Sequence, residues 1–241
     1  MTDQPPPNCD LDTNGEPSTT ARSDKGLLLE RHTATAFPGL PCLFLDRDGV
    51  IVAETHYLHT PDGVQMIPGM AEAIAAANRA GVAVAVVSNQ AGIGRGYYGW
   101  DAFESVQRVI QDHLAAKEAV IDAVAACAYH HEGVGPYAAD NHAWRKPRPG
   151  MLQGVARLLG IDLRHSYIVG DTVDDLLAGM AAGLPGGALT LTGHGRREAA
   201  RHREILARWQ GEDGFRVQTV ETPSTAIYAW LEGLGRPWTT H

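Results

Sequence analysis

From about residue 41 onwards, short apolar runs alternate with amphipathic stretches, and this alternation restricts the possible folds more than any other feature of the chain. The apolar runs cover residues 42–45, 82–88, 123–129, 166–170 and 188–193. Helical patterns separate them, over residues 70–81, 101–114, 151–159 and 173–183. Strands that are apolar throughout are typical of a parallel sheet buried on both faces. The pattern therefore predicts an α/β fold of three layers, with helices on both faces of a parallel sheet.

The two ends of the chain depart from this alternation. Residues 1–26 are rich in Pro, Ser, Thr, Asp and Asn and predict a disordered tail, because this composition buries too little apolar surface to fold. Residues 27–241 contain no internal repeat and suit a single domain. Residues 197–210 form a charged amphipathic pattern, which we interpret as a helical addition. A last strand is expected at 216–220 and a last helix at 225–234.

Charge and composition disfavour several classes of partner. A formal net charge of -8 argues against nucleic acid, which proteins bind with clustered basic side chains. No apolar run is long enough to span a bilayer, and residues 1–26 lack the apolar segment of a secretory signal. The three cysteines show no disulfide spacing. We therefore expect a cytoplasmic protein, a monomer or weak oligomer, with a small-molecule ligand and no membrane partner.

Polar residues stand at or near the ends of four predicted strands, where ligands bind in open α/β sheets. In chain order they are Asp46 and Asp48, then Ser88 and Asn89, then Lys146, and finally Asp171 with Asp174 and Asp175. Each group alone has an ordinary structural explanation, as a turn, a helix N-cap or an acidic first helical turn. Their combination, in this order and at successive strand ends, indicates a single chemical site.

The segments FLDRDGVI (44–51), SNQAGIGRG (88–96) and RKPRPGM (145–151) resemble the haloacid dehalogenase-like (HAD) superfamily over about residues 41–193. Within it they are similar to the histidinol-phosphatase and heptose-bisphosphate-phosphatase group. The resemblance implies a Rossmann-like fold and a Mg²⁺-dependent phosphomonoester hydrolase. Residues 50–68 are too few for a folded cap and core elements occupy residues 89–145, so we expect an essentially capless enzyme. D-glycero-D-manno-heptose 1,7-bisphosphate is the first expected substrate, with histidinol phosphate or another small phosphate ester as the alternative.

The resemblance also implies the catalytic roles. Asp46 would attack phosphorus and form an aspartyl-phosphate. Asp48 would protonate the leaving oxygen and then take a proton from the hydrolytic water. Mg²⁺ would be bound by Asp46, the backbone carbonyl of Asp48 and Asp171, since it prefers oxygen ligands. Asp175 would support either this metal or Lys146.

Other residues are expected to hold the substrate. By the same resemblance, Ser88, Asn89 and Lys146 would bind phosphoryl oxygens. Arg145 would recognise the substrate with its guanidinium, which suits phosphate. The loops at residues 55–64 and 129–144 would shape the pocket, and His56 and Tyr57 in the first of them are candidate substrate contacts. The GIGRG stretch is expected to be a flexible loop at the entrance, whose Arg95 either meets a second phosphate or is solvated.

A Cys and three His residues raise the question of zinc: Cys127, His130, His131 and His142. Many members of the group carry Cys-x-His followed by Cys-x-Cys here, which together supply four zinc ligands. In this chain Ala128 and Trp144 stand at two of those places, and Trp cannot bind zinc. We therefore expect a loop without zinc.

Two other functions remain open alongside hydrolysis. A catalytically inactive phosphate-binding module belongs to a different class. The presence of Asp46, Asp48, Ser88, Lys146 and Asp171 together argues against it. A phosphotransferase is the third possibility, because an aspartyl-phosphate can be passed to an acceptor other than water.

Overall fold

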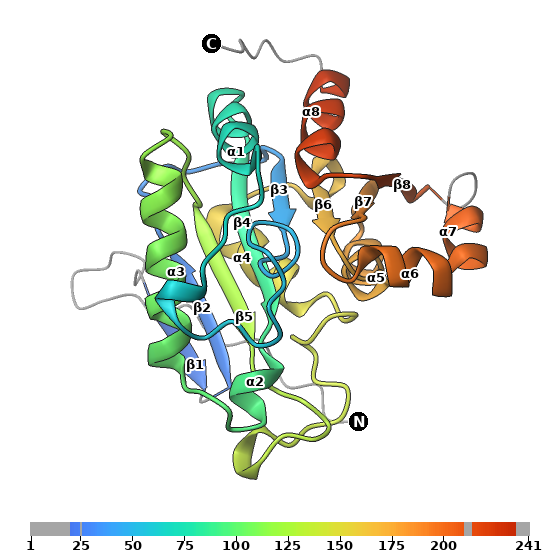
Figure 1. Cartoon of the computed structure of the whole chain (residues 1–241). Helices are drawn as coiled ribbons and strands as arrows, with labels where there is room; N and C mark the ends of the chain where they lie inside the picture. The colour runs from blue at the N-terminus through green and yellow to red at the C-terminus, as the bar shows by residue number, and fades with distance from the viewer. Residues whose placement is uncertain (1–19, 25, 210–213, 235–241) are drawn as a thin grey trace.

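In the computed structural model, the described residues are 20–24, 26–209 and 214–234, and they form one eight-stranded sheet (Figure 1). The strand order is β1-β2-β5-β4-β3-β6-β7-β8. The strands are β1 (Thr20–Asp24), β2 (Leu27–Arg31), β3 (Cys42–Leu45), β4 (Ala83–Asn89), β5 (Ala123–Cys127), β6 (Tyr167–Gly170), β7 (Gly186–Thr190) and β8 (Arg216–Val220). Strands β3 to β8 run parallel, whereas β1 and β2 pair antiparallel at one edge.

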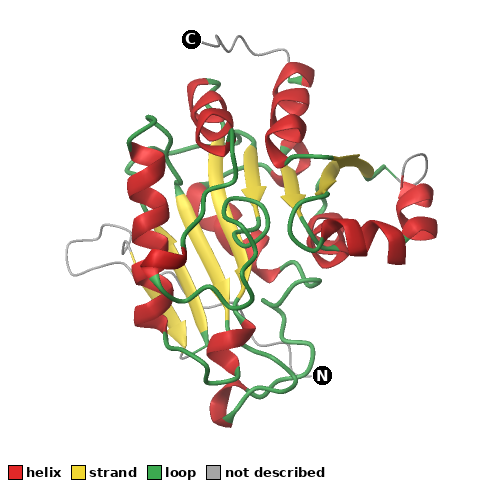
Figure 2. Ribbon diagram, viewed as in Figure 1, coloured by secondary structure: helices red, strands yellow, loops and turns green. Residues whose placement is uncertain are grey.

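Helices cover both faces of the sheet, as Figures 1 and 2 show. One face carries α1 (Met70–Arg79), α3 (Trp100–Ala115) and α8 (Pro223–Gly233). The other carries α4 (Gly150–Leu159) and α5 (Val173–Ala182). The short α2 (Ala91–Gly94) follows β4, and α6 (Gly195–Arg201) and α7 (Arg203–Trp209) lie between β7 and β8 in the chain. Three short 3₁₀ helices complete the set, η1 (Pro61–Gly63), η2 (Gly135–Tyr137) and η3 (Leu163–His165).

The apolar strands separate two hydrophobic cores. Along β3, Leu43 and Leu45 pack into the core beneath α1, α3 and α8. Cys42 and Phe44 pack into the core beneath α4 and α5. Successive side chains of a strand point to opposite faces, so a strand buried on both sides must be apolar at every position. The predicted three-layer α/β architecture is confirmed.

The structure also confirms the essentially capless arrangement. Within the described residues, only loops, η1 and α1 lie between β3 and β4. Between β4 and β5 the chain forms α2 and α3, and α3 packs into the core beside α1. The loop from Cys127 to α4 contains η2. The carboxyl ends of the parallel strands are therefore covered by loops.

Four details differ from the sequence prediction. The predicted tail is wrong for residues 20–24, which form β1, while residues 1–19 and 25 lie outside the described residues. Strand β2 was not expected. It covers the edge of β5 with a complete antiparallel register, and its Leu27, Leu28 and Leu29 are buried there. The parallel sheet therefore gains an antiparallel edge. The alternation of apolar runs and helices, which predicts the parallel strands, does not predict this edge.

The other two differences concern helices. The helical addition is two helices, α6 and α7, and the buried Leu206 of α7 joins the core beneath α4 and α5. Helix α3 begins at Trp100, one residue before the helical pattern predicted over 101–114, with Gly99 as its N-cap and no side-chain cap. Neither difference moves a residue of the predicted site.

Candidate active site

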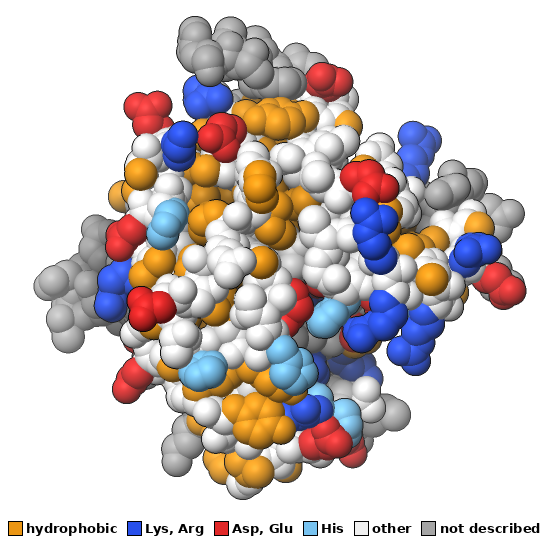
Figure 3. Space-filling model, viewed as in Figure 1, with side chains coloured by type: hydrophobic (Ala, Val, Ile, Leu, Met, Phe, Trp, Pro, Cys, Tyr) orange, Lys and Arg blue, Asp and Glu red, His pale blue; other side chains and the backbone are white. Residues whose placement is uncertain are grey.

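A pocket of about 290 Å³ opens at the carboxyl ends of β3, β4 and β6, and it contains most of the predicted site residues. Those that line it are Asp46, Asp48, Ser88, Asn89, Arg145, Lys146 and Asp171. Glu54, Tyr57, Tyr98, Asp174 and His194 also line it. In the space-filling view, acidic and histidine side chains gather around this end of the sheet (Figure 3). Parallel strands end on one side of a sheet, so residues 125 positions apart in the chain, from Asp46 to Asp171, meet here.

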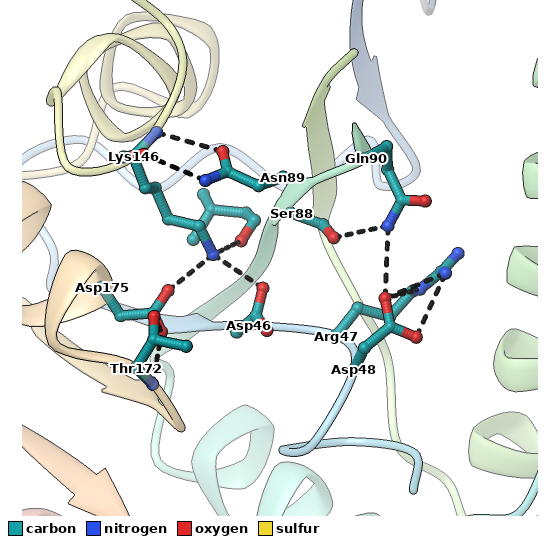
Figure 4. A network of polar contacts seen from close by, with 10 residues as sticks. Asp46, Arg47, Asp48, Ser88, Asn89, Gln90, Lys146, Thr172 and Asp175 are labelled. Atoms are coloured by element: carbon teal, nitrogen blue, oxygen red, sulfur yellow. Dashed lines mark hydrogen bonds and ion pairs between the residues drawn. The ribbon is translucent and has the colours of Figure 1, made fainter. Parts of the chain in front are cut away.

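Lys146 lies at the centre of the pocket floor (Figure 4). Its Nζ lies 2.6 Å from Asp46 Oδ1 and 2.6 Å from Asp175 Oδ1, and it donates to the carbonyl oxygen of Val87 at 2.7 Å. An ammonium group has three N–H donors, and these three acceptors match them. Although burial alone lowers the pKa of Lys146, the Asp175 and Asp46 carboxylates raise it above its ordinary value. Lys146 is therefore a fixed positive charge directly beside the predicted nucleophile.

Asn89 positions this lysine through the backbone. Its Nδ2 donates to the Lys146 carbonyl oxygen, and its Oδ1 accepts from the Lys146 N–H, both at 3.0 Å. Sequence reasoning assigned the Asn89 side chain to phosphate. The structure instead shows both ends of its amide engaged with the backbone of the lysine, which is 57 residues further along the chain. This pair of bonds connects the end of β4 to the loop before α4.

Asp175 holds Lys146 from the opposite side. Its Oδ2 accepts from the N–H and the hydroxyl of Thr172, at 3.1 and 2.7 Å, in the capping box that begins α5. Its Oδ1 meets Lys146 Nζ. Both carboxylate oxygens are thus engaged within the protein, so of the two roles expected for Asp175 the geometry favours support of the lysine. Asp174, its neighbour in the helix, is exposed.

Asp46 and Asp171 form an acidic pair whose charge is only partly balanced. Together with Asp175 they offer carboxylate oxygens that all lie within 4.8 Å of one another. Burial and the neighbouring carboxylates raise the pKa of both Asp46 and Asp171 well above the ordinary value. Crowded, buried carboxylates of this kind are suited to a hard divalent cation such as Mg²⁺, which removes their repulsion. The residues present therefore fit the predicted metal.

The backbone beside Asp171 is shaped to this cluster. Gly49 has a φ of +86°, and a Cβ there would lie 2.3 Å from Asp171 Oδ2. The same oxygen accepts a hydrogen bond from the His194 N–H at 2.7 Å. Only glycine fits both the positive φ and the close approach, which accounts for the glycine directly after Asp48.

Asp48 is held by two residues that the sequence analysis did not select. Arg47 Nε and Nη2 donate to its two carboxylate oxygens, at 3.1 and 3.2 Å. Gln90 Nε2 donates to Asp48 Oδ2 at 3.2 Å and to Ser88 Oγ at 2.8 Å (Figure 4). Arg47 is fully buried, with its guanidinium carbon 4.7 Å from the centre of the Phe103 ring. In the sequence, Arg47 and Gln90 are distinguished only by their positions, between Asp46 and Asp48 and directly after Asn89.

The loop wall of the pocket is held by Arg95, which is not among the pocket-lining residues. Its Nη1 donates to the Tyr57 hydroxyl at 2.6 Å, and its Nη2 pairs with the Glu132 carboxylate. Arg95 therefore joins the loop after β3 to the loop after β5. Arg95 was expected either to meet a second phosphate or to be solvated, and neither role describes this contact. The predicted flexible stretch is also partly helical, since α2 covers Ala91–Gly94.

The predicted substrate contacts, Arg145, His56 and Tyr57, differ in where the structure places them. Arg145 lines the pocket, with its Nη1 anchored to the Tyr129 carbonyl oxygen at 3.0 Å. His56 is exposed and does not line the pocket, whereas its neighbour Tyr57 does. Both His56 and Tyr57 have positive φ angles, of 58° and 67°, which turn the chain so that Tyr57 faces inward. Of the two candidates in this loop, the geometry therefore favours Tyr57, and the substrate contact of His56 stays a prediction.

The four candidate zinc ligands do not converge. Cys127 is buried in β5 among the core residues beneath α4. His142 stacks on Tyr129 with ring centres 4.0 Å apart. In the part of the chain that the structure describes, the potential ligand group at this loop is His130, His131 and Glu132. The expectation of a zinc-free loop stays a prediction.

His130 is built into the wall. Its Nδ1 accepts from the Glu132 N–H at 3.0 Å, and its Nε2 lies 3.5 Å from Arg95 Nη2. Burial, followed by the positive charges of Arg145 and Arg95, lowers the pKa of His130 to about 4. His130 is therefore neutral near pH 7 and acts as a hydrogen-bonding part of the wall.

Known proteins share this architecture and these motifs. The family model for HAD-like hydrolases matches residues 143–212. A D-glycero-β-D-manno-heptose-1,7-bisphosphate 7-phosphatase of Mesorhizobium japonicum is 48% identical over 168 residues, which cover 69% of this chain and 77% of the relative. The enzyme of the same name from Rhodopseudomonas palustris is 39% identical over 64% of this chain and 85% of its own.

Solved structures agree with these relatives. A Mesorhizobium loti protein described as a HAD-like phosphatase superposes with a TM-score of 0.76 and 40% identity, over 89% of this chain and 97% of its own. The D,D-heptose 1,7-bisphosphate phosphatase of B. bronchiseptica, solved with magnesium and phosphate, gives 0.66 and 31%, over 80% and 99%. None of the described helices has the length and apolar character needed to cross a membrane. With its relatives, its fold and its strand-end cluster in agreement, the chain belongs to the HAD-like family of phosphatases.

Proposed function

We propose that this phosphatase removes the 7-phosphate of D-glycero-β-D-manno-heptose 1,7-bisphosphate in a Mg²⁺-dependent reaction. The observation that carries the proposal is the contact between Lys146 Nζ and Asp46 Oδ1 at the end of β3, with Asp48 and Ser88 on the same pocket wall. A lysine fixed beside a carboxylate offers a phosphoryl group both a nucleophile and a counter-charge. The relatives at 39 to 48% identity bear the name of this activity.

The residues of the chain suit a two-step displacement. Asp46 attacks phosphorus, and the bond to the sugar oxygen breaks while Asp48 gives that oxygen a proton. Asp48 then takes a proton from a water molecule that attacks the aspartyl-phosphate, which releases inorganic phosphate and restores Asp46. Lys146 and the Ser88 hydroxyl stabilise the phosphoryl oxygens throughout. Mg²⁺ held by Asp46, Asp171 and the Asp48 carbonyl would offset charge repulsion and polarise the phosphoryl group.

The remaining substrate phosphate requires a cation outside this cluster. Arg145 lines the same pocket, and its anchor on Tyr129 leaves further N–H donors in a fixed plane. A guanidinium of this kind suits a second phosphate. Glu54, a carboxylate that also lines the pocket, accepts a hydrogen bond from the His56 N–H at 2.6 Å. Arg145 thus supports a bisphosphate as the substrate in preference to a monophosphate.

A substrate panel tests the proposal. The purified full chain with Mg²⁺ is given both anomers of the heptose bisphosphate, histidinol phosphate and 4-nitrophenyl phosphate, and ³¹P NMR identifies which phosphate is lost. We expect the 7-phosphate of the β anomer to be removed with the highest kcat/KM, and no turnover when Mg²⁺ is chelated. Faster turnover of histidinol phosphate, or loss of the 1-phosphate, would contradict the substrate assignment. If no ester is turned over, the proposal that the protein is a phosphatase is contradicted.

A further inference from the structure

Gln90 is a buried polar residue beside the reacting groups, with 2% of its surface exposed, and none of the catalytic roles above uses it. We propose that Gln90 is a positioning residue that joins the proton donor Asp48 to the phosphate-binding Ser88 and holds the two as one unit. The proposal rests on the proposed function, since it assumes that Asp48 protonates the leaving oxygen.

The first support is the double contact of one amide group. Gln90 Nε2 donates to Asp48 Oδ2 at 3.2 Å and to Ser88 Oγ at 2.8 Å. An amide nitrogen has two hydrogens, so one is directed at each partner. The reverse orientation would set the amide oxygen against a carboxylate oxygen, both of them acceptors, and the contacts thus fix which end is nitrogen.

The second support is that Gln90 is itself held rigidly. The Tyr98 hydroxyl donates to Gln90 Oε1 at 2.7 Å, and the Gln90 N–H donates to the Cys127 carbonyl oxygen at 2.7 Å. Tyr98 can approach only because residue 92 is glycine, where a Cβ would lie 2.3 Å from the tyrosine ring. A side chain fixed at its backbone and at its amide oxygen presents its two hydrogens in a single geometry.

Arg47 alone would not give Asp48 the same position. Its guanidinium holds the two carboxylate oxygens from one side, but within the described part of the chain it makes no hydrogen bond to Ser88. Gln90 supplies the cross-link from the end of β3 to the end of β4. Because Ser88 Oγ accepts from Gln90, its own hydrogen is left for an acceptor such as a phosphoryl oxygen. Ser88, which binds the phosphoryl group, and Asp48, the proton donor, are thereby aligned with each other before substrate binds.

The chemical consequence depends on the leaving group. A sugar alkoxide leaves only as it receives a proton from Asp48, whereas 4-nitrophenolate is stable as an anion and leaves without one. A loss of Asp48 alignment therefore slows the first step for the sugar ester far more than for the nitrophenyl ester. A loss of phosphate binding or of folding slows both alike.

The test measures leaving-group release in the first turnover by rapid quench, at saturating substrate, so that the later hydrolysis of the phosphoenzyme does not contribute. In Gln90→Leu we expect release from the heptose bisphosphate to fall by about tenfold or more, within the range that general acid catalysis supplies. Release from 4-nitrophenyl phosphate should fall by less than about threefold, so that the ratio of the two rates changes.

Two further variants complete the series. Tyr98→Phe removes only the hydroxyl that holds Gln90 and should shift the same ratio in the same direction by a smaller factor. Gln107→Leu is the matched control, since Gln107 is a buried glutamine on α3 whose amide has no hydrogen-bond partner among the described residues. It should leave the ratio unchanged.

Equal losses on both substrates in Gln90→Leu would overturn the proposal, as would an unchanged rate on the sugar ester. If the wild-type protein instead hydrolyses no phosphate ester, the proposed function itself has failed. The two failures are therefore distinguishable by the wild-type rates alone.

Discussion

The floor of the pocket (Asp46, Lys146, Asp171 and Asp175) and its loop wall (Tyr57, Arg95, His130 and Glu132) are held in different ways. On the floor, the three carboxylates lie at strand ends or at a helix start, and Lys146, in the loop before α4, is only 3% exposed. On the wall, Arg95 crosses between two loops to Glu132, whose side chain is 60% exposed. Charge interactions are stronger away from solvent, so the floor tolerates little change, whereas the wall can vary with substrate.

The largest effect is expected from the floor. Lys146→Met removes the counter-charge of Asp46 and leaves Asp46 and Asp175 without their shared partner. We expect kcat to fall by about a thousandfold or more, as for loss of a transition-state donor. Steady-state kinetics measures this, with Lys117→Met as the control because Lys117 pairs with Glu72 on the surface. A fall of less than tenfold would show that the lysine is a structural ion pair.

The metal offers the second largest effect. Asp171→Asn removes one carboxylate of the acidic pair, so Mg²⁺ should no longer stabilise the folded chain. For the wild type we expect a rise in Tm of about 5 °C or more when Mg²⁺ reaches about 100 times its Kd. Asp62→Asn, at an exposed position in η1, should keep the full rise. An equal rise in Asp171→Asn would place the metal elsewhere.

The wall should respond through binding. Arg95→Met removes the bond to Tyr57 and the pair with Glu132, which frees both loops. We expect KM for the heptose bisphosphate to rise by about tenfold while kcat stays within about twofold, because Tyr57, the pocket-lining residue of this wall, would contact substrate equally before and during reaction. Arg108→Met, at an exposed position on α3, is the control. A large fall in kcat with unchanged KM would contradict the expectation that the wall acts on substrate binding and the floor on the chemical step.

The smallest effect is a pH dependence of stability from the wall. The pKa of His130 is lowered to about 4 by burial and by the nearby arginines, so at pH 5 the unfolded chain binds a proton there and the folded chain does not. Stability is therefore lost as the pH falls from about 6.5 towards 4. In His130→Asn the loss of Tm between pH 7 and 5 should be smaller by about 2 °C.

His113→Asn is the control for that measurement, since His113 lies at an exposed position on α3. It should follow the wild-type curve. If His130→Asn also follows it, the imidazole does not remain neutral in the folded wall and the lowered pKa is contradicted.

The floor could be predicted from the sequence for a physical reason. Asp46, Ser88 and Asp171 each end an apolar run, and a polar residue at such a position lies at the carboxyl edge of a parallel sheet. The place of Asn89 was predicted correctly and its phosphate contact stays a prediction, but the bonds of its side chain to the Lys146 backbone were not foreseen. Its partner is a backbone group 57 residues away, and residue spacing carries no information about such a pair.

The wall and the sheet edge could not be predicted in the same way. Of the two candidates His56 and Tyr57, Tyr57 lines the pocket, because both residues adopt positive φ angles, which neither residue type predicts. Arg47 and Gln90 are polar residues whose burial depends on partners from α3 and from the segment after α2. Strand β1 was mistaken for tail because its composition is polar, although β2 supplies it with backbone partners.

The phosphoenzyme provides the most direct test of the central claim, that Asp46 beside Lys146 is the nucleophile of a phosphatase. Asp48→Asn should retain the first step on 4-nitrophenyl phosphate and lose the base for the second, so phosphoenzyme accumulates. Acid quench and borohydride reduction convert an aspartyl-phosphate into homoserine, which mass spectrometry locates in the chain. We predict homoserine at position 46. Turnover by the wild type without any modified Asp46 in either protein, or a modified residue elsewhere, would contradict the account.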